Sequence, residues 1–317
     1  EDINSFGYRD LSQTTIALAK IVKHVGGNER KTFQAGSSQQ ILRNLLIGKN
    51  LESKRFIFRH IACASLHILP DFDPRHLSNF IYAFAIAQYV PSFDDGSTLY
   101  DILATKVLSD MINYNRQDIT NTLWAYAQMN EANSALYKEA GDVICAHKNL
   151  YEFKPQELSN IVWAYATAGE SHPTMFKKIG NHIIGLDNLN RFDAQAFSNI
   201  LWAYATAGES HPKLFKKVAD HIVALKDLDR FDAQALSNIL WAYATAGESH
   251  PKLFQKVGNH IASLDNLNEF IPQALSNTLW AYATAKEPHP KLFQKVGNHI
   301  ASLDNLDEFK PQHLSNT

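Results

Sequence analysis

Side chains that could recognise a nucleic acid base recur at fixed intervals along this 317-residue chain. Side-chain amides offer a hydrogen-bond donor beside an acceptor, which suits the edge of a base, and aromatic rings can stack on a base. The recurring set, called the amide–tryptophan stripe below, consists of a glutamine, an asparagine, a tryptophan and a threonine in that order. Its members are Gln117, Asn121, Trp124, Gln156, Asn160, Trp163, Thr167, Gln195, Asn199, Trp202, Thr206, Gln234, Asn238, Trp241, Thr245, Gln273, Asn277, Trp280 and Thr284.

The elements that must position the stripe follow from a tandem repeat. The five tryptophans lie 39 residues apart, and a period of 20–50 residues indicates a solenoid or a propeller. Within residues 194–232, apolar residues recur at helical spacing up to Tyr204, and His211-Pro212 then begins a second apolar helical stripe. The pattern therefore predicts that each repeat consists of helix A, a turn, helix B and a linker, and it contains no strand pattern. The sequence predicts an all-α fold, an α-solenoid of stacked helix-turn-helix hairpins with a 39-residue repeat.

A helical wheel separates two faces of helix A. In the repeat that begins near residue 155, the apolar residues Leu158 and Tyr165 share one face and should pack on helix B. The amide–tryptophan stripe falls on the opposite face, bordered by small residues. One set per hairpin would suit a reader of single-stranded RNA that takes about one base per repeat. The alternatives are structural. They are packing of the tryptophans between neighbouring A helices, bridging of adjacent repeat backbones by the asparagines, and a solvated or capping role for the glutamines.

The register of the repeat divides the chain into four segments. They are 1–71, divergent helical repeats with net basic charge; 72–115, a degenerate repeat with a turn insertion; 116–310, five regular repeats; and 311–317, the start of a further repeat. We place the insertion within Pro91–Ser97 and expect an additional helical pair around 38–48 and 53–68. A solenoid needs a polar terminal cap, and the sequence ends at the opening of another helix A instead. We therefore expect a fragment of a longer protein, and we also expect a targeting leader before Glu1.

Charge is distributed unevenly over the chain. The formal net charge is −2, but residues 1–60 carry +5 and the remaining residues −7. A surface for a polyanion is therefore easiest to place at the N-terminal end. The candidate phosphate contacts are Arg9, Lys20, Lys23 and Arg43. The alternative is an ordinary solvated basic face.

Several other residue types point to no site. The repeated histidines, such as His172 and His182, lie ten residues apart, which is not a metal-ligand spacing, so we expect no metal and no cofactor. No phosphate-cradling loop or nucleophile elbow occurs, so we expect no enzyme and no small-molecule substrate. No run of 18 apolar residues occurs, which excludes a membrane-spanning helix. We expect Cys63 and Cys145 to be buried and the helix B lysines, such as Lys217, to be solvated.

The sequences PQELSNIVWAYATAG at 155–169 and PQALSNTLWAYATA at 272–285 resemble octotricopeptide repeats. They are also similar to the helical repeats of RAP-domain and FAST-kinase-like proteins. The resemblance covers residues 116–317 well and 72–90 in part. It implies helical hairpins that act on mitochondrial or chloroplast RNA, in processing, stability, translation or ribosome assembly. It also implies that Gln156, Asn160 and Thr167, with their equivalents, contact bases.

We therefore expect a non-catalytic protein that binds single-stranded RNA in a mitochondrion or plastid. The rival hypothesis is a protein-binding scaffold that uses the same surface. A third hypothesis is a structural subunit of an organellar ribosome or another large complex. A positive groove beside the amide–tryptophan stripe would favour RNA, and a neutral or acidic one would favour a protein partner.

Overall fold

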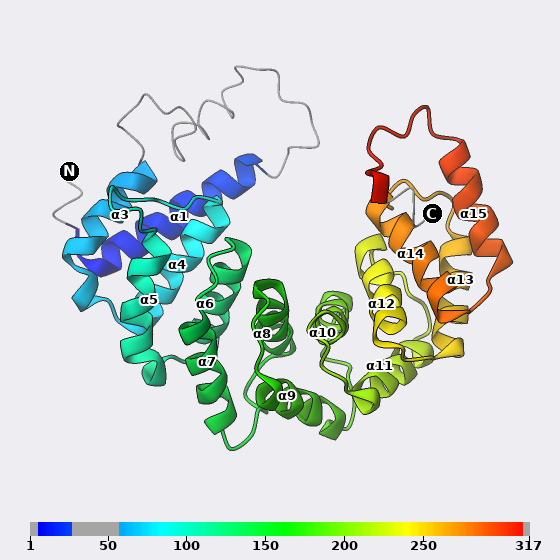
Figure 1. Ribbon diagram of the computed structural model, residues 1–317, viewed down its shortest axis with the longest axis horizontal. Coiled ribbons are helices and arrows are strands. Elements are labelled where there is room, and N and C mark those ends of the chain that lie inside the picture. The colour runs from blue at the N-terminus through cyan, green and yellow to red at the C-terminus, as the bar shows by residue number, and fades with distance from the viewer. Residues whose placement is uncertain (1–5, 27–56, 313–317) are drawn as a thin grey trace. The chain divides into compact units, whose positions relative to one another are not determined.

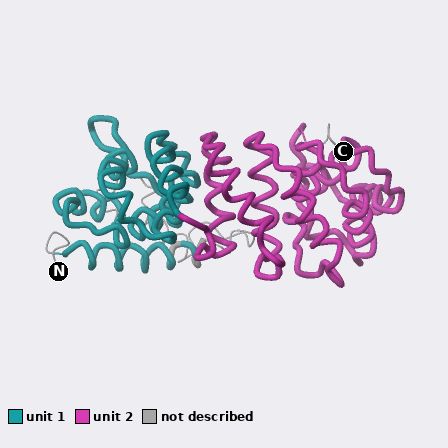
Figure 2. Tube along the Cα trace, turned by 90° about the horizontal axis from the view of Figure 1, so that it is seen from below, with its two compact units in different colours: residues 1–147 teal, residues 148–317 magenta. Residues whose placement is uncertain are grey.

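The computed structural model describes residues 6–26 and 57–312, which belong to two compact units, residues 1–147 and 148–317 (Figure 2). Unit 1 contains the helices α1 (Tyr8–Gly26), α3 (Ile57–His67), α4 (Pro74–Ala87), α5 (Leu99–Asp110), α6 (Arg116–Gln128) and α7 (Ser134–Ala146). Unit 2 contains α8 (Pro155–Ala168), α9 (Pro173–Gly185), α10 (Ala194–Thr206), α11 (Pro212–Ala224), α12 (Ala233–Ala246), α13 (Pro251–Ser263), α14 (Pro272–Ala285) and α15 (Pro290–Ala301).

These helices confirm the predicted all-α solenoid. The A helices of unit 2 begin at residues 155, 194, 233 and 272, and the B helices begin at the prolines 173, 212, 251 and 290, so both series keep the 39-residue period. Among the described residues, β-type pairing is limited to an isolated bridge between Ser92 and Thr98. The first helix expected near 38–48 lies outside the described residues, and part of the second forms α3.

The turn between α4 and α5 differs from the corresponding turns of unit 2. It runs from residue 88 to residue 98, whereas the turn between α8 and α9 runs only from 169 to 172. The longer turn is partly offset by a shorter linker between α5 and α6.

Histidines begin the B helices of unit 2. The Nδ1 atom of His211 accepts a hydrogen bond from the backbone N–H of Leu214 at 3.3 Å, and Pro212 fills the first helical position. The same N-cap occurs at His172, His250 and His289. An accepting Nδ1 requires an unprotonated nitrogen, and burial lowers the pKa of His211, which favours that neutral form. This histidine series therefore shapes the turn between helix A and helix B.

Tyrosines on α10, α12 and α14 tie neighbouring repeats together. The hydroxyl groups of Tyr204, Tyr243 and Tyr282 donate to the carbonyl oxygens of Phe176, Phe215 and Phe254, each at 2.6 Å. Each acceptor lies on helix B of the preceding repeat, and all three tyrosines are buried. The bonds therefore fix each helix A against the repeat before it by the same contact.

The prediction that the helix B lysines are solvated was wrong for Lys217 and Lys256. Lys217 is half-buried, and its Nζ donates to the carbonyl oxygens of Ile184, at 2.9 Å, and of Leu186. Lys256 makes the equivalent bonds to Val223 and Leu225. These ammonium groups satisfy carbonyls left unpaired where the preceding helix B ends.

The prediction for the cysteines was also wrong. Cys63 is exposed and Cys145 is only half-buried. The buried face of α3 is formed instead by Phe58, Ile61 and their neighbours, so Cys63 falls on the opposite side of that helix.

Replacing Tyr243 with Phe should destabilise the protein by about 1 kcal/mol, the typical net contribution of one buried hydrogen bond. Urea unfolding measures the effect. Tyr151, whose side chain is 67% exposed, offers the matched control Tyr151→Phe, which should leave the midpoint unchanged. Equal midpoints for the two variants would show that the bond to Phe215 contributes nothing.

Lys286 closes helix α14 in a left-handed conformation, with φ 57°, where Gly247 closes α12 with φ 67°. A side chain is disfavoured in this region, so Lys286→Gly should stabilise the protein by about 1 kcal/mol. The reverse change, Gly247→Lys, should lower stability by a similar amount, although space around Gly247 is open. Thermal unfolding of the two variants checks the opposite signs, and a loss of stability in Lys286→Gly would contradict the prediction.

Candidate nucleic-acid interface

The amide–tryptophan stripe lies on successive A helices of unit 2. Figure 1 shows α8, α10, α12 and α14 along one side of this unit and α9, α11, α13 and α15 along the other. Each A helix of unit 2 packs against the next one in the series. The repeat thus brings four copies of the stripe, from Gln156 to Thr284, onto one side of unit 2.

The exposure of the A-helix side chains agrees with the two faces predicted by the helical wheel. In α8 the apolar residues Leu158 and Tyr165 are buried, as predicted. Gln156 and Thr167 are exposed, and Asn160 and Trp163 are half-buried. The equivalent residues of α10, α12 and α14 have the same classes of exposure. In unit 1, α6 presents Gln117 and Gln128 exposed and Asn121 and Trp124 half-buried.

Three of the five tryptophans pack on an aromatic ring of a neighbouring A helix. The ring centroids of Trp241 and Trp280 lie 6.4 Å apart with their planes 31° from parallel, so neighbouring A helices bring two indoles together. In unit 1, Trp124 lies 5.1 Å from Tyr82 of α4. Because the indoles are also half-exposed, part of each ring surface remains accessible for stacking.

The asparagine side chains make no hydrogen bond to the described part of the chain. This holds for Asn160, Asn199, Asn238 and Asn277, and the side-chain amides of Gln156, Gln195, Gln234 and Gln273 share this property. A bridge from these asparagines to the backbone of an adjacent repeat is therefore not formed. The donors and acceptors of both series are left for solvent or a ligand.

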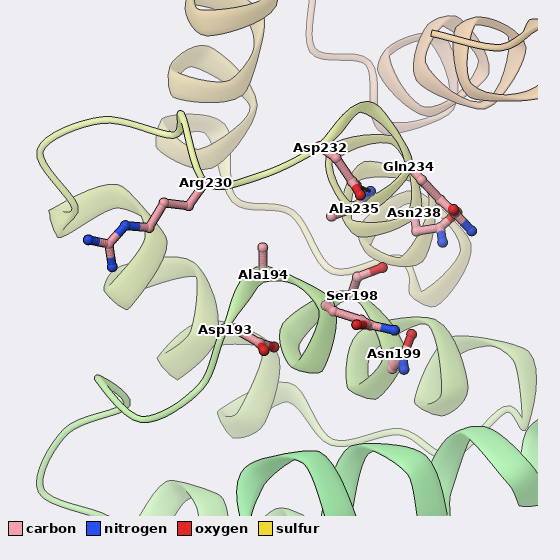
Figure 3. A pocket seen from close by; sticks show the side chains of 10 residues that line it. Asp193, Ala194, Ser198, Asn199, Arg230, Asp232, Gln234, Ala235 and Asn238 are labelled. Carbon is pink, nitrogen blue, oxygen red and sulfur yellow. Dashed lines mark hydrogen bonds between the residues drawn. The ribbon is translucent and has the colours of Figure 1, made fainter. Parts of the chain in front are cut away.

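A polar cleft of about 330 Å³ separates the N-terminal halves of α10 and α12. Figure 3 shows Asn199 on one wall and Gln234 and Asn238 on the other. Asp193 and Asp232 also line the cleft, and each accepts a hydrogen bond at 2.7 Å from the backbone N–H three residues later. The carboxylates thus cap their helices, while the amides face the opening unpaired. A cleft of this size is at the lower end of the range for small-ligand sites.

Little charge lies on the stripe itself. Helices α10, α12 and α14 contain no Asp, Glu, Lys or Arg, and α8 contains only Glu157. The turns after the A helices carry half-buried acids such as Glu209, whose pKa is raised by burial. The surface is therefore neutral in the middle, with acids in these turns, which limits the attraction for phosphate.

The candidate phosphate contacts lie in unit 1. Arg9, Lys20 and Lys23 are exposed on α1, which packs along α4. At 100° per residue the three positions fall within about 60° of one another around the helix. Arg9 also donates from Nε to the hydroxyl of Tyr8 at 3.2 Å. Arg43 lies outside the described residues.

One basic residue beside the cleft was missed in the sequence. Arg230 lines the same cleft from the linker before α12, and Figure 3 shows its side chain extending away from the amides. The sequence repeat could have identified it, because the same Arg-Phe-Asp triplet precedes α10, with Arg191 at the equivalent position. Both arginines are exposed.

The described residues contain no group of three or more His, Cys, Asp or Glu side chains arranged to hold a metal ion. None of the described helices has the length and apolar character needed to cross a membrane.

Two comparisons with known proteins bear on this surface. Residues 90–309 match the sequence pattern of the family described as RNA-editing substrate-binding complex 6 protein. The match includes α6 and all the A helices of unit 2. A comparison with curated proteins finds no match.

Proposed function

The chain belongs to the RNA-editing substrate-binding complex 6 protein family. From this we propose that it binds single-stranded RNA, without catalysis, as one component of an RNA–protein complex. The observation that carries the proposal is the set of unpaired amides beside half-exposed tryptophans, repeated on α8, α10, α12 and α14. The family name itself refers to RNA editing and to a substrate-binding complex, which agrees with a role in handling RNA.

The chemistry of the stripe suits bases better than phosphates. An amide can pair its donor and acceptor with a base edge, and an indole can stack on any base, at about 1–3 kcal/mol per base. The neutral surface of α10, α12 and α14 supplies little attraction for the RNA backbone. We assign phosphate contacts to Arg9, Lys20 and Lys23 on α1 and to Arg43. The resemblance to octotricopeptide repeats supports a site of action in a mitochondrion or plastid, in RNA processing, stability, translation or ribosome assembly.

A protein-binding scaffold is the second candidate function. The observation that favours it is the same lack of positive charge on the stripe, together with acids such as Glu209 in the neighbouring turns. In that case the unpaired amides would hydrogen-bond to the backbone or side chains of a partner, and the indoles would pack on it. A structural place in an organellar ribosome or another large complex combines both kinds of contact.

Replacing Asn160, Asn199 and Asn238 together with Ala should weaken binding to a pool of random single-stranded RNA about a hundredfold. The reason is that a hydrogen-bond pair to a base edge contributes roughly 1 kcal/mol or more per position. Fluorescence anisotropy with labelled RNA measures the affinity. The control changes Asn181 and Asn298, which are exposed on the B helices α9 and α15, to Ala. If the unchanged chain does not bind RNA at low salt, the proposed function is contradicted. If the two variants bind with equal affinity, the three asparagines do not contact the RNA.

Replacing Arg9, Lys20 and Lys23 with Gln should make RNA binding less sensitive to salt. Each phosphate contact on a single strand contributes about −0.7 to the slope of log affinity against log salt, so the slope should become shallower by about 2. Lys213, Lys252 and Lys291, exposed in the first turns of three B helices, provide the matched control. If the control variant reduces the salt dependence of RNA affinity as much as the α1 variant does, the assignment of phosphate contacts to α1 is wrong.

A further inference from the structure

The four copies of the amide–tryptophan stripe in unit 2 are chemically identical. Each consists of Gln, Asn, Trp and Thr, at residues 156–167, 195–206, 234–245 and 273–284. Exposure agrees as well, since the glutamine and threonine are exposed and the asparagine and tryptophan half-buried in every copy. The supporting residues also repeat, with a buried serine before each asparagine and a buried alanine after each tryptophan.

The copies also follow one another at a regular interval along the helices. The A helices begin 39 residues apart, and the bonds from Tyr204, Tyr243 and Tyr282 to the preceding helix B all measure 2.6 Å. No hydrogen bond within the described chain turns the amide of one copy differently from the others. A ligand that advances by one unit per repeat therefore meets the same set of chemical groups at each step.

The two A helices of unit 1 that carry the register do not continue this uniform series. Helix α6 has Gln128 in place of the threonine. Helix α4 has Tyr82 in place of the tryptophan, Arg75 in place of the glutamine and Ile86 in place of the threonine, and it keeps only Asn79. Identical contact sets are thus confined to unit 2 among the described helices.

We infer that unit 2 recognises a run of one repeated nucleotide in single-stranded RNA, with one nucleotide per A helix. This inference rests on the proposed function and deepens it, because it specifies the class of RNA. Identical amide pairs at identical positions prefer the same base at every step, whereas a mixed sequence would satisfy only some of them. A uniform site also allows the run to bind in several registers, so affinity should keep rising as the run lengthens beyond four nucleotides.

The test uses the full chain and labelled RNAs of equal length: oligo(U), oligo(A), oligo(C) and a mixed sequence without runs. Anisotropy titrations should give one homopolymer at least tenfold tighter binding than the mixed RNA. In a mixed RNA that carries a single run of four preferred nucleotides, changing any one of the four should weaken binding by a similar factor. These results support the inference.

A variant provides a second, independent readout. Asn199→Asp replaces an amide with an acceptor-only carboxylate on α10 and leaves the other three copies intact. The variant should lose about tenfold in affinity for the homopolymer and should tolerate a different base at one position of the four-nucleotide run. The control Asn181→Asp, on the exposed surface of α9, should keep the original preference.

The outcomes separate the two claims. Binding of the mixed RNA as tightly as every homopolymer would overturn the inference and leave the proposed RNA-binding function standing. Failure of all the RNAs to bind would overturn both. A penalty at only one of the four positions would also overturn the inference, because unequal positions are incompatible with a uniform code.

Discussion

The geometry of unit 2 depends on the contact that joins one repeat to the next. A buried tyrosine hydroxyl on each of α10, α12 and α14 donates to a phenylalanine carbonyl on the preceding helix B, as Tyr243 does to Phe215. The N-cap histidine reinforces the joint, because the Nε2 atom of His289 lies 3.1 Å from Asn259 of the preceding repeat, while its Nδ1 caps α15. A Cβ at Gly258 would lie 2.5 Å from this histidine ring, so the ring fills the space beside the glycine. Repetition of this joint presents the amide–tryptophan stripe at regular steps.

Much of this architecture could be predicted from the sequence because the repeat tests each interpretation several times. A proline after His211 and an apolar stripe after it predict a helix start, and three further copies remove the ambiguity. Interactions across repeats could not be predicted in the same way. Lys217 looks like a solvated residue in its own helix, and only the packed structure brings it to the carbonyl of Ile184. Cys63 was misplaced because α3 lies outside the regular repeats, so no second copy checked its register.

The candidate site shows the same division between local pattern and three-dimensional context. The wheel placed Asn160 and Trp163 on the face opposite Tyr165, and their burial agrees. The wheel could not decide whether the asparagine amide is used within the protein, because that depends on atoms of the neighbouring helix. The amides prove to be unpaired, and the face around them is uncharged on α10, α12 and α14. Such a surface is better suited to base edges and ring faces than to phosphates.

All five tryptophans of the chain belong to the amide–tryptophan stripe, so intrinsic tryptophan fluorescence reports on the candidate interface alone. The most direct measurement is therefore a titration of the unlabelled chain with single-stranded RNA, followed by quenching with acrylamide. The account predicts a saturable change in tryptophan emission and protection of the indoles from acrylamide at saturating RNA, because stacked bases would cover the exposed parts of the rings. RNA binding detected by anisotropy, with emission and acrylamide quenching both unchanged, would contradict it and place the RNA on another surface.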